Sequence, residues 1–229
     1  MKIYTDPRLL AAGIVGGTLS RHNGNMCDTD AQTPVYKELD IPPQHILHLH
    51  QTHSTHILTI NTPLQAQQIA DTPVQDADGW LFTLSGWGGA ILTADCVPLF
   101  LWDSNGGPFS LTHCGWRGVA AKLPFQAAVA LKKAGAETIC AWLGPHIQSC
   151  CFEVQADVAE QFPSSCHRPK NGKIFIDLTA EIIRQLTQAG ISETDIKAPY
   201  YCTCGDKENF FSWRRDHIRQ NLLSFMYKL

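Results

Sequence analysis

The chain has 229 residues, 44% of them hydrophobic, which is enough for one large domain over residues 1–229 with a sizeable core and argues against a disordered protein. Its formal net charge of −3, with no run of Lys or Arg, argues against a nucleic-acid partner, and no apolar segment approaches the ~20 residues of a membrane span. Nine cysteines, an odd number in a chain too large to need disulfide staples, indicate reduced thiols and a cytoplasmic location.

The first half of the chain is predicted to be mainly β-structure. In residues 1–45 only residues typical of turns stand out, and we predict no helix or strand there. Residues 46–60 are rich in β-formers around a polar centre and predict two short strands that flank a turn. This stretch holds five histidines, which cannot all face one site: His45, His48, His50, His53 and His56. A polar loop over 71–78 precedes apolar runs at 79–84 and 89–93, which predict two further strands.

A β-hairpin is predicted at the centre of the chain. Two apolar runs, 97–102 and 108–111, are separated by Ser-Asn-Gly-Gly at 104–107, which supplies the backbone conformations of a tight turn. Cys96 lies just before the first run and His113 just after the second. Because antiparallel pairing brings these two ends side by side, we expect a thiol and an imidazole at one rim of the sheet.

The second half of the chain mixes helices with strands. Its helices show apolar residues at helical spacing between start and stop signals, and its strands are short apolar runs bounded by turn residues. The predicted elements are a helix at 124–134, a strand at 138–143, a helix at 154–162, a strand at 173–176, a helix from an N-cap at Asp177 to Gly190, and a β-like tail.

The residues at the hairpin rim leave several interpretations open. Cys96, His113 and one histidine from the 46–60 stretch would form a three-ligand metal site, whose open fourth position is the catalytic pattern. A single thiolate leaves zinc net positive, which lowers the pKa of bound water from ~16 toward ~7. Without metal, Cys96 could be a nucleophile and His113 its base, with Asp95 or another carboxylate orienting the imidazole. The structural alternative is a buried thiol and a hydrogen-bonded histidine.

Arginines lie beside aromatic residues in two places. Trp116 and Arg117 follow the hairpin, and Arg214 and Arg215 follow Trp213. Guanidinium next to an aromatic ring suits an anionic or planar ligand, through paired hydrogen bonds and stacking. The alternative is that these arginines are solvated and extend over apolar neighbours.

Several other polar residues receive structural interpretations. Asp76 and Asp78 are interpreted as turn carboxylates, and His146, after Gly-Pro, as a loop residue. Cys202 and Cys204 are a weak indication of a second metal site, because thiols two residues apart also occur by chance in a chain with nine cysteines.

Seven sequence blocks resemble, in order, the signature blocks of the laccase-domain family, whose members are also called polyphenol oxidase, purine nucleoside phosphorylase or peptidoglycan-editing-factor proteins. The blocks are Gln-Thr-His-Ser at 51–54, Asp-Ala-Asp-Gly at 76–79, Leu-Thr-Ala-Asp-Cys-Val-Pro at 92–98, His-Cys-Gly-Trp-Arg-Gly at 113–118, Gly-Pro at 144–145 with Cys-Cys-Phe-Glu-Val at 150–154, Cys-Thr at 202–203, and Phe-Ser-Trp-Arg-Arg-Asp at 211–216. Their ordered occurrence is far more specific than any one motif.

The resemblance implies an α+β fold with mixed β-sheets and flanking helices, of the cytotoxic-necrotizing-factor-like cysteine hydrolase type. It implies one zinc ion per chain, with copper as the less favoured metal, and singles out His53, Cys96 and His113 as the ligands. The activities it implies are phosphorolysis of adenosine, inosine and methylthioadenosine, and zinc-dependent deamination of adenosine. The partners are then a small-molecule nucleoside and phosphate, and the oligomeric state stays open.

Further site residues are expected around these ligands. Arg21 resembles the arginine of the family's N-terminal Ser-x-Arg segment, on the phosphate or ribose side. The expected catalytic residues are Arg21, Asp95 and Gln51, and the expected substrate-binding residues are Trp116, Arg117, Arg214 and Arg215. The segment between Arg21 and Leu39 is shorter than the family pattern, and Asp-His-Ile at 216–218 replaces its glycine-led turn, so the choice of substrate is open.

Three other functions compete with the nucleoside enzyme. The peptidoglycan-editing name suggests an amidase that removes a wrong amino acid from a cell-wall precursor, using Cys96 and His113. A copper-dependent polyphenol oxidase ranks lower, because multicopper chemistry needs paired histidine motifs and only His48-x-His50 is present. A metal-binding protein without catalysis is the remaining class.

Overall fold

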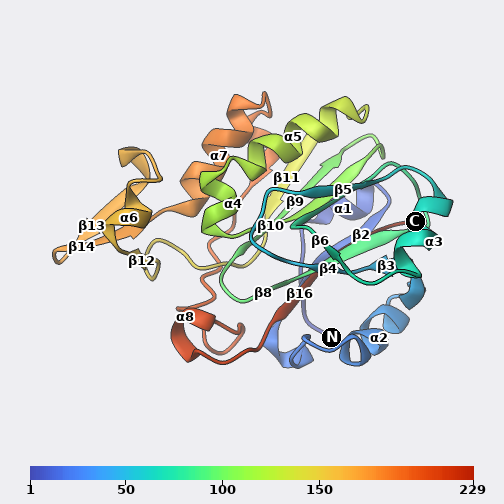
Figure 1. The fold of residues 1–229 in the computed structure, drawn as a ribbon, viewed down its shortest axis with the longest axis horizontal. Helices are drawn as coiled ribbons and strands as arrows, with labels where there is room; N and C mark the ends of the chain where they lie inside the picture. The colour runs from blue at the N-terminus through green and yellow to red at the C-terminus, as the bar shows by residue number, and fades with distance from the viewer.

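Two β-sheets stack face to face at the centre of the molecule, with helices on the outer sides (Figure 1). The computed structural model describes residues 1–229. The larger sheet has the order β15 (Ile196–Lys197), β11 (Ile139–Leu143), β9 (Val97–Asp103), β10 (Phe109–Cys114), β7 (Gly79–Phe82), β5 (Ile57–Ile60). The smaller has the order β1 (Ile3–Tyr4), β2 (Ile14–Leu19), β16 (Leu222–Lys228), β8 (Gly88–Thr93), β3 (Ile46–Leu47). Both sheets mix parallel and antiparallel pairs, which confirms the α+β prediction.

The helices and two small sheets lie around this pair. The helices are α1 (Pro7–Ala11), α2 (Thr29–Glu38), α3 (Pro63–Ala70), α4 (Trp116–Ala120), α5 (Leu123–Lys133), α6 (Ala156–Ala159), α7 (Leu178–Gln188) and α8 (Trp213–Asp216). The small sheets are β12 (Glu153–Val154), β14 (Lys173–Ile176) and β13 (His167–Lys170), and the pair β4 (Leu49–His50) and β6 (Gln75–Asp76). None of the helices combines the length and the apolarity that crossing a membrane requires.

Strand β9 is buried on both faces and organises the core. Leu99 and Leu101 belong to the cluster that the six-stranded sheet forms with α5 and α7. Phe100 and Trp102, which point the opposite way, belong to the cluster between the two sheets. An unbroken apolar run, rather than an alternating one, is typical of a strand covered on both faces. The layers therefore run α5 and α7, six-stranded sheet, five-stranded sheet, α2 (Figure 1).

The hairpin prediction is confirmed. The pairing of its two strands determines which residues lie opposite one another at the end of the sheet. Strands β9 and β10 pair antiparallel, with His113 opposite Pro98 and Cys114 opposite Val97. Cys96 therefore lies at the same sheet edge as His113. The helix that Asp177 was expected to start is also confirmed, because the Asp177 carboxylate accepts the backbone N–H of Ala180 at 2.9 Å.

The structure corrects the sequence predictions in three places. Residues 1–45 are not irregular: they contain α1, α2 and β2, which pairs with β16 in the middle of a sheet. A Cβ atom on Gly16 would lie 2.7 Å from the Phe225 carbonyl oxygen, so this glycine allows close strand approach rather than marking a turn. Residues 46–60 form three short strands, not two. The helix predicted at 154–162 shortens to α6, because Val154 pairs with Ile174 in the β12–β14 ladder.

Candidate functional site

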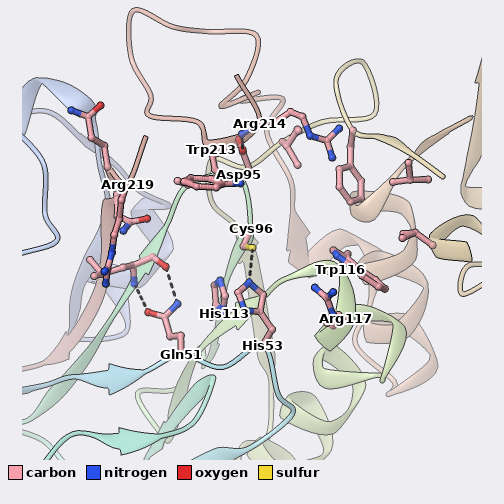
Figure 2. A pocket seen from close by; sticks show the side chains of 18 of the residues that line it. Gln51, His53, Asp95, Cys96, His113, Trp116, Arg117, Trp213, Arg214 and Arg219 are labelled. Carbon is pink, nitrogen blue, oxygen red and sulfur yellow. Dashed lines mark hydrogen bonds between the residues drawn. The ribbon is translucent and has the colours of Figure 1, made fainter. Parts of the chain in front are cut away.

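Three donor side chains from separate segments meet at one end of the six-stranded sheet. Cys96 precedes β9, His113 lies in β10, and His53 comes from the loop between β4 and β5. Their ligand atoms all lie within 4.8 Å of one another, and His53 Nε2 is 3.8 Å from Cys96 Sγ. Figure 2 shows the two imidazoles and the thiol gathered at the base of a pocket. The structure thus brings together the thiol and imidazole of the hairpin rim and one of the five clustered histidines.

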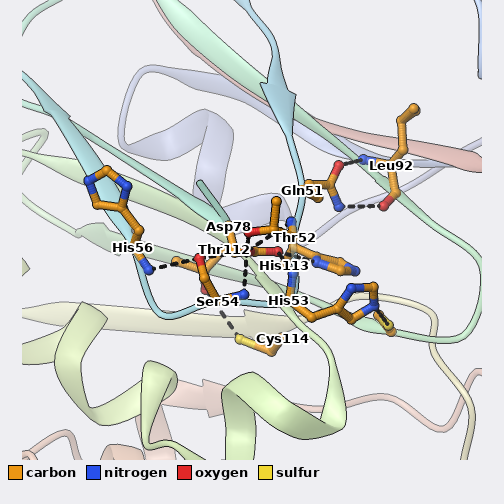
Figure 3. Close-up of polar contacts among 11 residues, drawn as sticks. Gln51, Thr52, His53, Ser54, His56, Asp78, Leu92, Thr112, His113 and Cys114 are labelled. Atoms are coloured by element: carbon orange, nitrogen blue, oxygen red, sulfur yellow. Dashed lines mark hydrogen bonds and ion pairs between the residues drawn. The ribbon is translucent and has the colours of Figure 1, made fainter. Parts of the chain in front are cut away.

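The carboxylate of Asp78 holds two of these ligands in place (Figure 3). It is fully buried and lies 2.8 Å from His113 Nδ1. It also accepts backbone N–H bonds from Thr52 at 3.2 Å, His53 at 3.0 Å and Ser54 at 2.6 Å, and the Ser54 hydroxyl at 2.8 Å. Because Nδ1 of His113 is engaged, Nε2 is the nitrogen available to a metal, which is the usual carboxylate–histidine arrangement of metal sites.

The turn that presents the thiol is held by Asp95. Its buried carboxylate accepts the hydroxyl of Thr203 at 2.6 Å, the hydroxyl of Ser212 at 3.0 Å and the backbone N–H of Arg214 at 2.7 Å. Asp95 has a φ of 99° and His53 a φ of 60°, conformations that non-glycine residues rarely adopt. Such strain persists where surrounding contacts over-determine the backbone, and here it lies at or beside two ligands.

The ligands also set each other's charge. Burial raises the pKa of Cys96, but the imidazoles of His113 and His53 outweigh it and lower that pKa to about 6. Burial lowers the pKa of His113, but the Cys96 thiolate and the Asp78 carboxylate raise it to about 9. Between these values, the metal-free site is a thiolate facing an imidazolium. The thiolate is the form that binds metals and attacks electrophiles.

The donor set fits a zinc ion. Two imidazoles and one thiolate are ligands that zinc prefers, and three protein ligands leave one tetrahedral position open. Gly115 makes room for them: a Cβ atom there would lie 2.7 Å from Cδ2 of His53 and 3.2 Å from Sγ of Cys96. Any larger residue would push the ligands out of position, so the local packing is adapted to this arrangement.

The open side of the centre faces a pocket of about 1110 Å³. Ligand pockets commonly measure ~300–1,000 Å³. This pocket is just above the upper end of that range, so it can hold a small organic molecule together with a small anion. Its side chains include three guanidinium groups and several aromatic rings (Figure 2). These arginine and aromatic residues of the lining are Trp116, Arg117, Phe152, Trp213, Arg214 and Arg219.

The three residues expected to be catalytic lie in different settings. Gln51 lines the pocket, and its amide makes two hydrogen bonds with the backbone of Leu92, at 2.7 and 2.8 Å. Asp95 also lines the pocket, but both of its oxygens are engaged as described above. Arg21 is not among the lining residues. Its guanidinium donates to the Lys207 carbonyl and lies 5.0 Å from the ring centre of Phe211.

Three of the four expected substrate-binding residues line the pocket. Trp116 and Arg117 stack on each other at 4.3 Å, and Arg214 donates to the carbonyl of Glu153 at 2.7 Å. Arg215 is not in the lining. It pairs with Asp216 at 2.6 Å and donates to backbone carbonyls of the loop before α8, so it stabilises that loop.

The sequence interpretation misplaced or missed several residues of the candidate site. The carboxylate that orients His113 is Asp78, not Asp95, and Asp78 is a buried hub rather than a turn residue. Trp213 and Arg219 line the pocket and were not expected there as binding residues. Asp78 and Trp213 could have been found, because both lie inside recognised blocks, whereas Arg219 follows the block and carries no signal.

Comparison with known proteins gives the family. The model of the family described as multi-copper polyphenol oxidoreductase laccase matches residues 28–226. A protein named adenosine deaminase RL5, from an unknown prokaryotic organism, is 29% identical over 224 residues, covering 89% of this chain and 86% of its own. A purine nucleoside phosphorylase of Xylella fastidiosa (strain 9a5c) is 34% identical over 177 residues, covering 73% and 66%.

A solved structure agrees on the fold. The Bacillus licheniformis protein YfiH superposes with a TM-score of 0.84 at 22% identity, covering 94% of this chain and 93% of that one. With the family match extending from before α2 into β16, the chain belongs to the multi-copper polyphenol oxidoreductase laccase family.

Proposed function

We propose that this protein is a zinc-dependent purine nucleoside enzyme, which catalyses phosphorolysis of adenosine, inosine and methylthioadenosine and deamination of adenosine. The observation that carries the proposal is the open set of His53, Cys96 and His113 at the base of a pocket with aromatic and guanidinium walls. Relatives named adenosine deaminase and purine nucleoside phosphorylase support the same class of substrate.

Different pocket residues suit the metal ion, the phosphate and the purine ring. A zinc ion held by the three ligands would supply Lewis acidity and lower the pKa of nearby water. In deamination, water adds at C6 of adenosine and the amino group leaves as ammonia. In phosphorolysis, a phosphate oxygen bonds to C1′ as the C1′–N9 bond breaks and the purine leaves with the bonding electrons. Arg117, Arg214 and Arg219 suit the phosphate, while Trp116 and Trp213 suit the purine ring.

In this proposal, the residues that were expected to be catalytic mostly hold other parts of the site in place. Gln51 joins the loop that carries His53 to β8, and Asp95 fixes the turn before Cys96. Arg21 supports the segment that leads into α8, since its guanidinium is engaged with Lys207 and Phe211. Its role is then to hold the pocket wall rather than to touch phosphate.

Metal analysis with a product assay tests the proposal. Purified protein is expected to carry about one zinc ion per chain at this centre, to form inosine from adenosine without phosphate, and to form adenine and ribose 1-phosphate when phosphate is added. Chelation should abolish both reactions and zinc should restore them. Activity that survives complete metal removal would contradict zinc dependence, and copper with phenol oxidation would overturn the nucleoside proposal.

Trp213 provides a test of purine stacking. Its side chain is 54% exposed although it lines the pocket, so a flat ligand can cover it. Stacking of a base on an aromatic ring is worth ~1–3 kcal/mol, and the low end for an exposed ring predicts that Trp213→Ala raises KM for adenosine about 5-fold. Trp213→Phe should retain most of the affinity. Steady-state kinetics that show an unchanged KM in Trp213→Ala would remove this residue from the binding site.

One observation favours a second candidate, the amidase. Without metal, Cys96, His113 and Asp78 form a thiolate, imidazolium and carboxylate series, the arrangement of a cysteine nucleophile whose proton has passed to an oriented histidine. The cysteine-hydrolase type of architecture belongs to this second proposal. Metal-free protein that hydrolyses an amide cell-wall precursor, and loses that activity on thiol alkylation, would establish the amidase in place of the nucleoside enzyme.

A further inference from the structure

Three thiols outside the pocket base form a second compact cluster. Cys150 and Cys151 lie in the loop after β11, and Cys202 lies in the segment that precedes α8. Cys150 Sγ is 3.3 Å from Cys151 Sγ and 3.5 Å from Cys202 Sγ, and all three sulfurs lie within 4.8 Å of one another. The structure thus groups Cys202 with two distant cysteines, where the sequence had suggested a pairing with Cys204.

The backbone holds the two loops in a fixed relation. His146 and Cys202 form a parallel β-bridge, in which the His146 N–H donates to the Tyr201 carbonyl at 3.1 Å and the Thr203 N–H to the His146 carbonyl at 3.0 Å. His146, interpreted from the sequence as a loop residue, is fully buried and bonds to Thr179 at 2.8 Å. The sulfurs are therefore positioned by the fold rather than by chance surface contact.

The sulfur of Cys202 is already a hydrogen-bond acceptor. The backbone N–H of Gln148 donates to it at 3.5 Å and that of Gly205 at 3.3 Å. Donors that point at a sulfur stabilise its thiolate form, which is the form that ligates metals. Burial outweighs these two donors and raises the pKa of Cys202 above its ordinary value, so the charge of a bound ion would have to complete the deprotonation.

The spacing of the sulfurs suits one metal ion better than a disulfide. Thiolates bound at ~2.3 Å to a tetrahedral ion lie about 3.8 Å apart. The Cys150–Cys151 and Cys150–Cys202 separations of 3.3 and 3.5 Å are close to that value, and the third pair of sulfurs lies within 4.8 Å. A disulfide needs a sulfur separation of ~2.05 Å, which requires a movement of more than about 1 Å and leaves the third thiol unpaired. An all-sulfur donor set selects soft ions and excludes Mg²⁺ and Ca²⁺.

We propose that Cys150, Cys151 and Cys202 form a second metal site, which binds one thiophilic ion, Zn²⁺ or Cu⁺. Cys204 or water completes the coordination. The site shares no residue with the His53, Cys96 and His113 centre and does not depend on the proposed function. It would act on the pocket as a brace, because the Cys151 carbonyl accepts the guanidinium of Arg214 at 3.4 Å and Phe152, the next residue, lies under that guanidinium.

Metal titration of the reduced 229-residue protein tests the site, with gel filtration under argon to remove loosely bound ions. The wild type is expected to retain about two Zn²⁺ or Co²⁺ ions per chain, and Cys150→Ser and Cys96→Ser about one each. Cys150 is exposed, so its replacement leaves the core intact. With Co²⁺, the thiolate charge-transfer absorbance should fall to about a quarter in Cys150→Ser if water completes the second site, and to about a fifth if Cys204 does, since only the Cys96 thiolate then remains bound. Cys166→Ser, at a buried thiol elsewhere, should retain both ions.

The outcomes separate this proposal from the nucleoside one. Loss of both Zn²⁺ and Cu⁺ binding in Cys96→Ser, or retention in Cys150→Ser of as much Zn²⁺ and as much Cu⁺ as in the wild type, would overturn the second site. One ion retained in both the wild type and Cys96→Ser, and none in Cys150→Ser, would support the second site and contradict the zinc centre. Parallel loading with Zn²⁺ and with Cu⁺, in the presence of glutathione as competitor, identifies the ion, and retention of neither overturns the site.

Discussion

If the proposed zinc centre is correct, replacing Cys96 with alanine should weaken zinc binding by His53, Cys96 and His113 by about 10²–10³-fold and remove the proposed nucleoside turnover with it. Four-ligand zinc sites bind with ~10–16 kcal/mol, so one ligand accounts for about 2.5–4 kcal/mol, and 1.4 kcal/mol is tenfold. The two imidazoles that remain are neutral ligands, so no thiolate is left to offset part of the positive charge of the ion. The measurement is zinc affinity by competition with a chromophoric chelator, alongside kcat/KM for adenosine.

Cys114→Ala is the matched control for this variant. Cys114 follows His113 and is fully buried, but its sulfur contacts the Thr112 hydroxyl at 3.3 Å and is not part of the donor set. Its truncation should lower stability without changing zinc affinity. A Cys96→Ala protein that keeps its zinc but loses amide hydrolysis would instead identify Cys96 as a nucleophile.

Replacing Asp78 with asparagine should reduce both metal affinity and stability. The amide cannot hold His113 through a charged hydrogen bond, and loss of such a partner typically costs ~10–100-fold in metal affinity or activity. The same carboxylate accepts three backbone N–H groups from the loop that carries His53. Removing a buried charge partner costs about 3 kcal/mol, which for a chain of this size lowers Tm by about 6–12 °C.

Asp76→Asn, two residues earlier in the same block, provides the comparison. Asp76 is 73% exposed and pairs with an equally exposed His50, so its replacement should leave Tm and zinc affinity unchanged. If Asp78→Asn lowers Tm but leaves zinc affinity and kcat/KM intact, then the carboxylate only supports the loop and does not position the ligands. Calorimetry and zinc competition on the same preparations distinguish these results.

Local signals in the sequence were sufficient wherever neighbours in the chain determine the structure. The helix after Asp177 has its cap, its apolar spacing and its stop within about one dozen residues, and the hairpin has two apolar runs around a glycine turn. Both were predicted with nearly the observed bounds. Strand β2 was not, because Gly16 is explained by the approach of β16, more than two hundred positions later in the chain, and Gly17 by the approach of β1.

In the candidate site, too, features set by neighbouring residues could be predicted and features set by distant residues could not. Cys96 and His113 could be placed together from the hairpin alone, whereas choosing His53 among five histidines needed the family resemblance. The role of Asp78 depends on donors from 52–54 and from β10, which no spacing rule brings together. The thiol cluster likewise joins residues 150–151 to residue 202, through a bridge at His146 that gave no sequence signal.

The central place of β16 has a consequence for how the metal centre is assembled. The three ligands span only residues 53–113, yet Thr93 at the end of β8 pairs with Leu222, and Asp95 is anchored by Ser212 and Arg214. A peptide limited to the ligand-bearing segment would therefore lack the supports of its own thiol turn. Because contacts of such large sequence separation form slowly, we expect the proposed centre to become competent for metal only after the segment that carries α8 and β16 has docked.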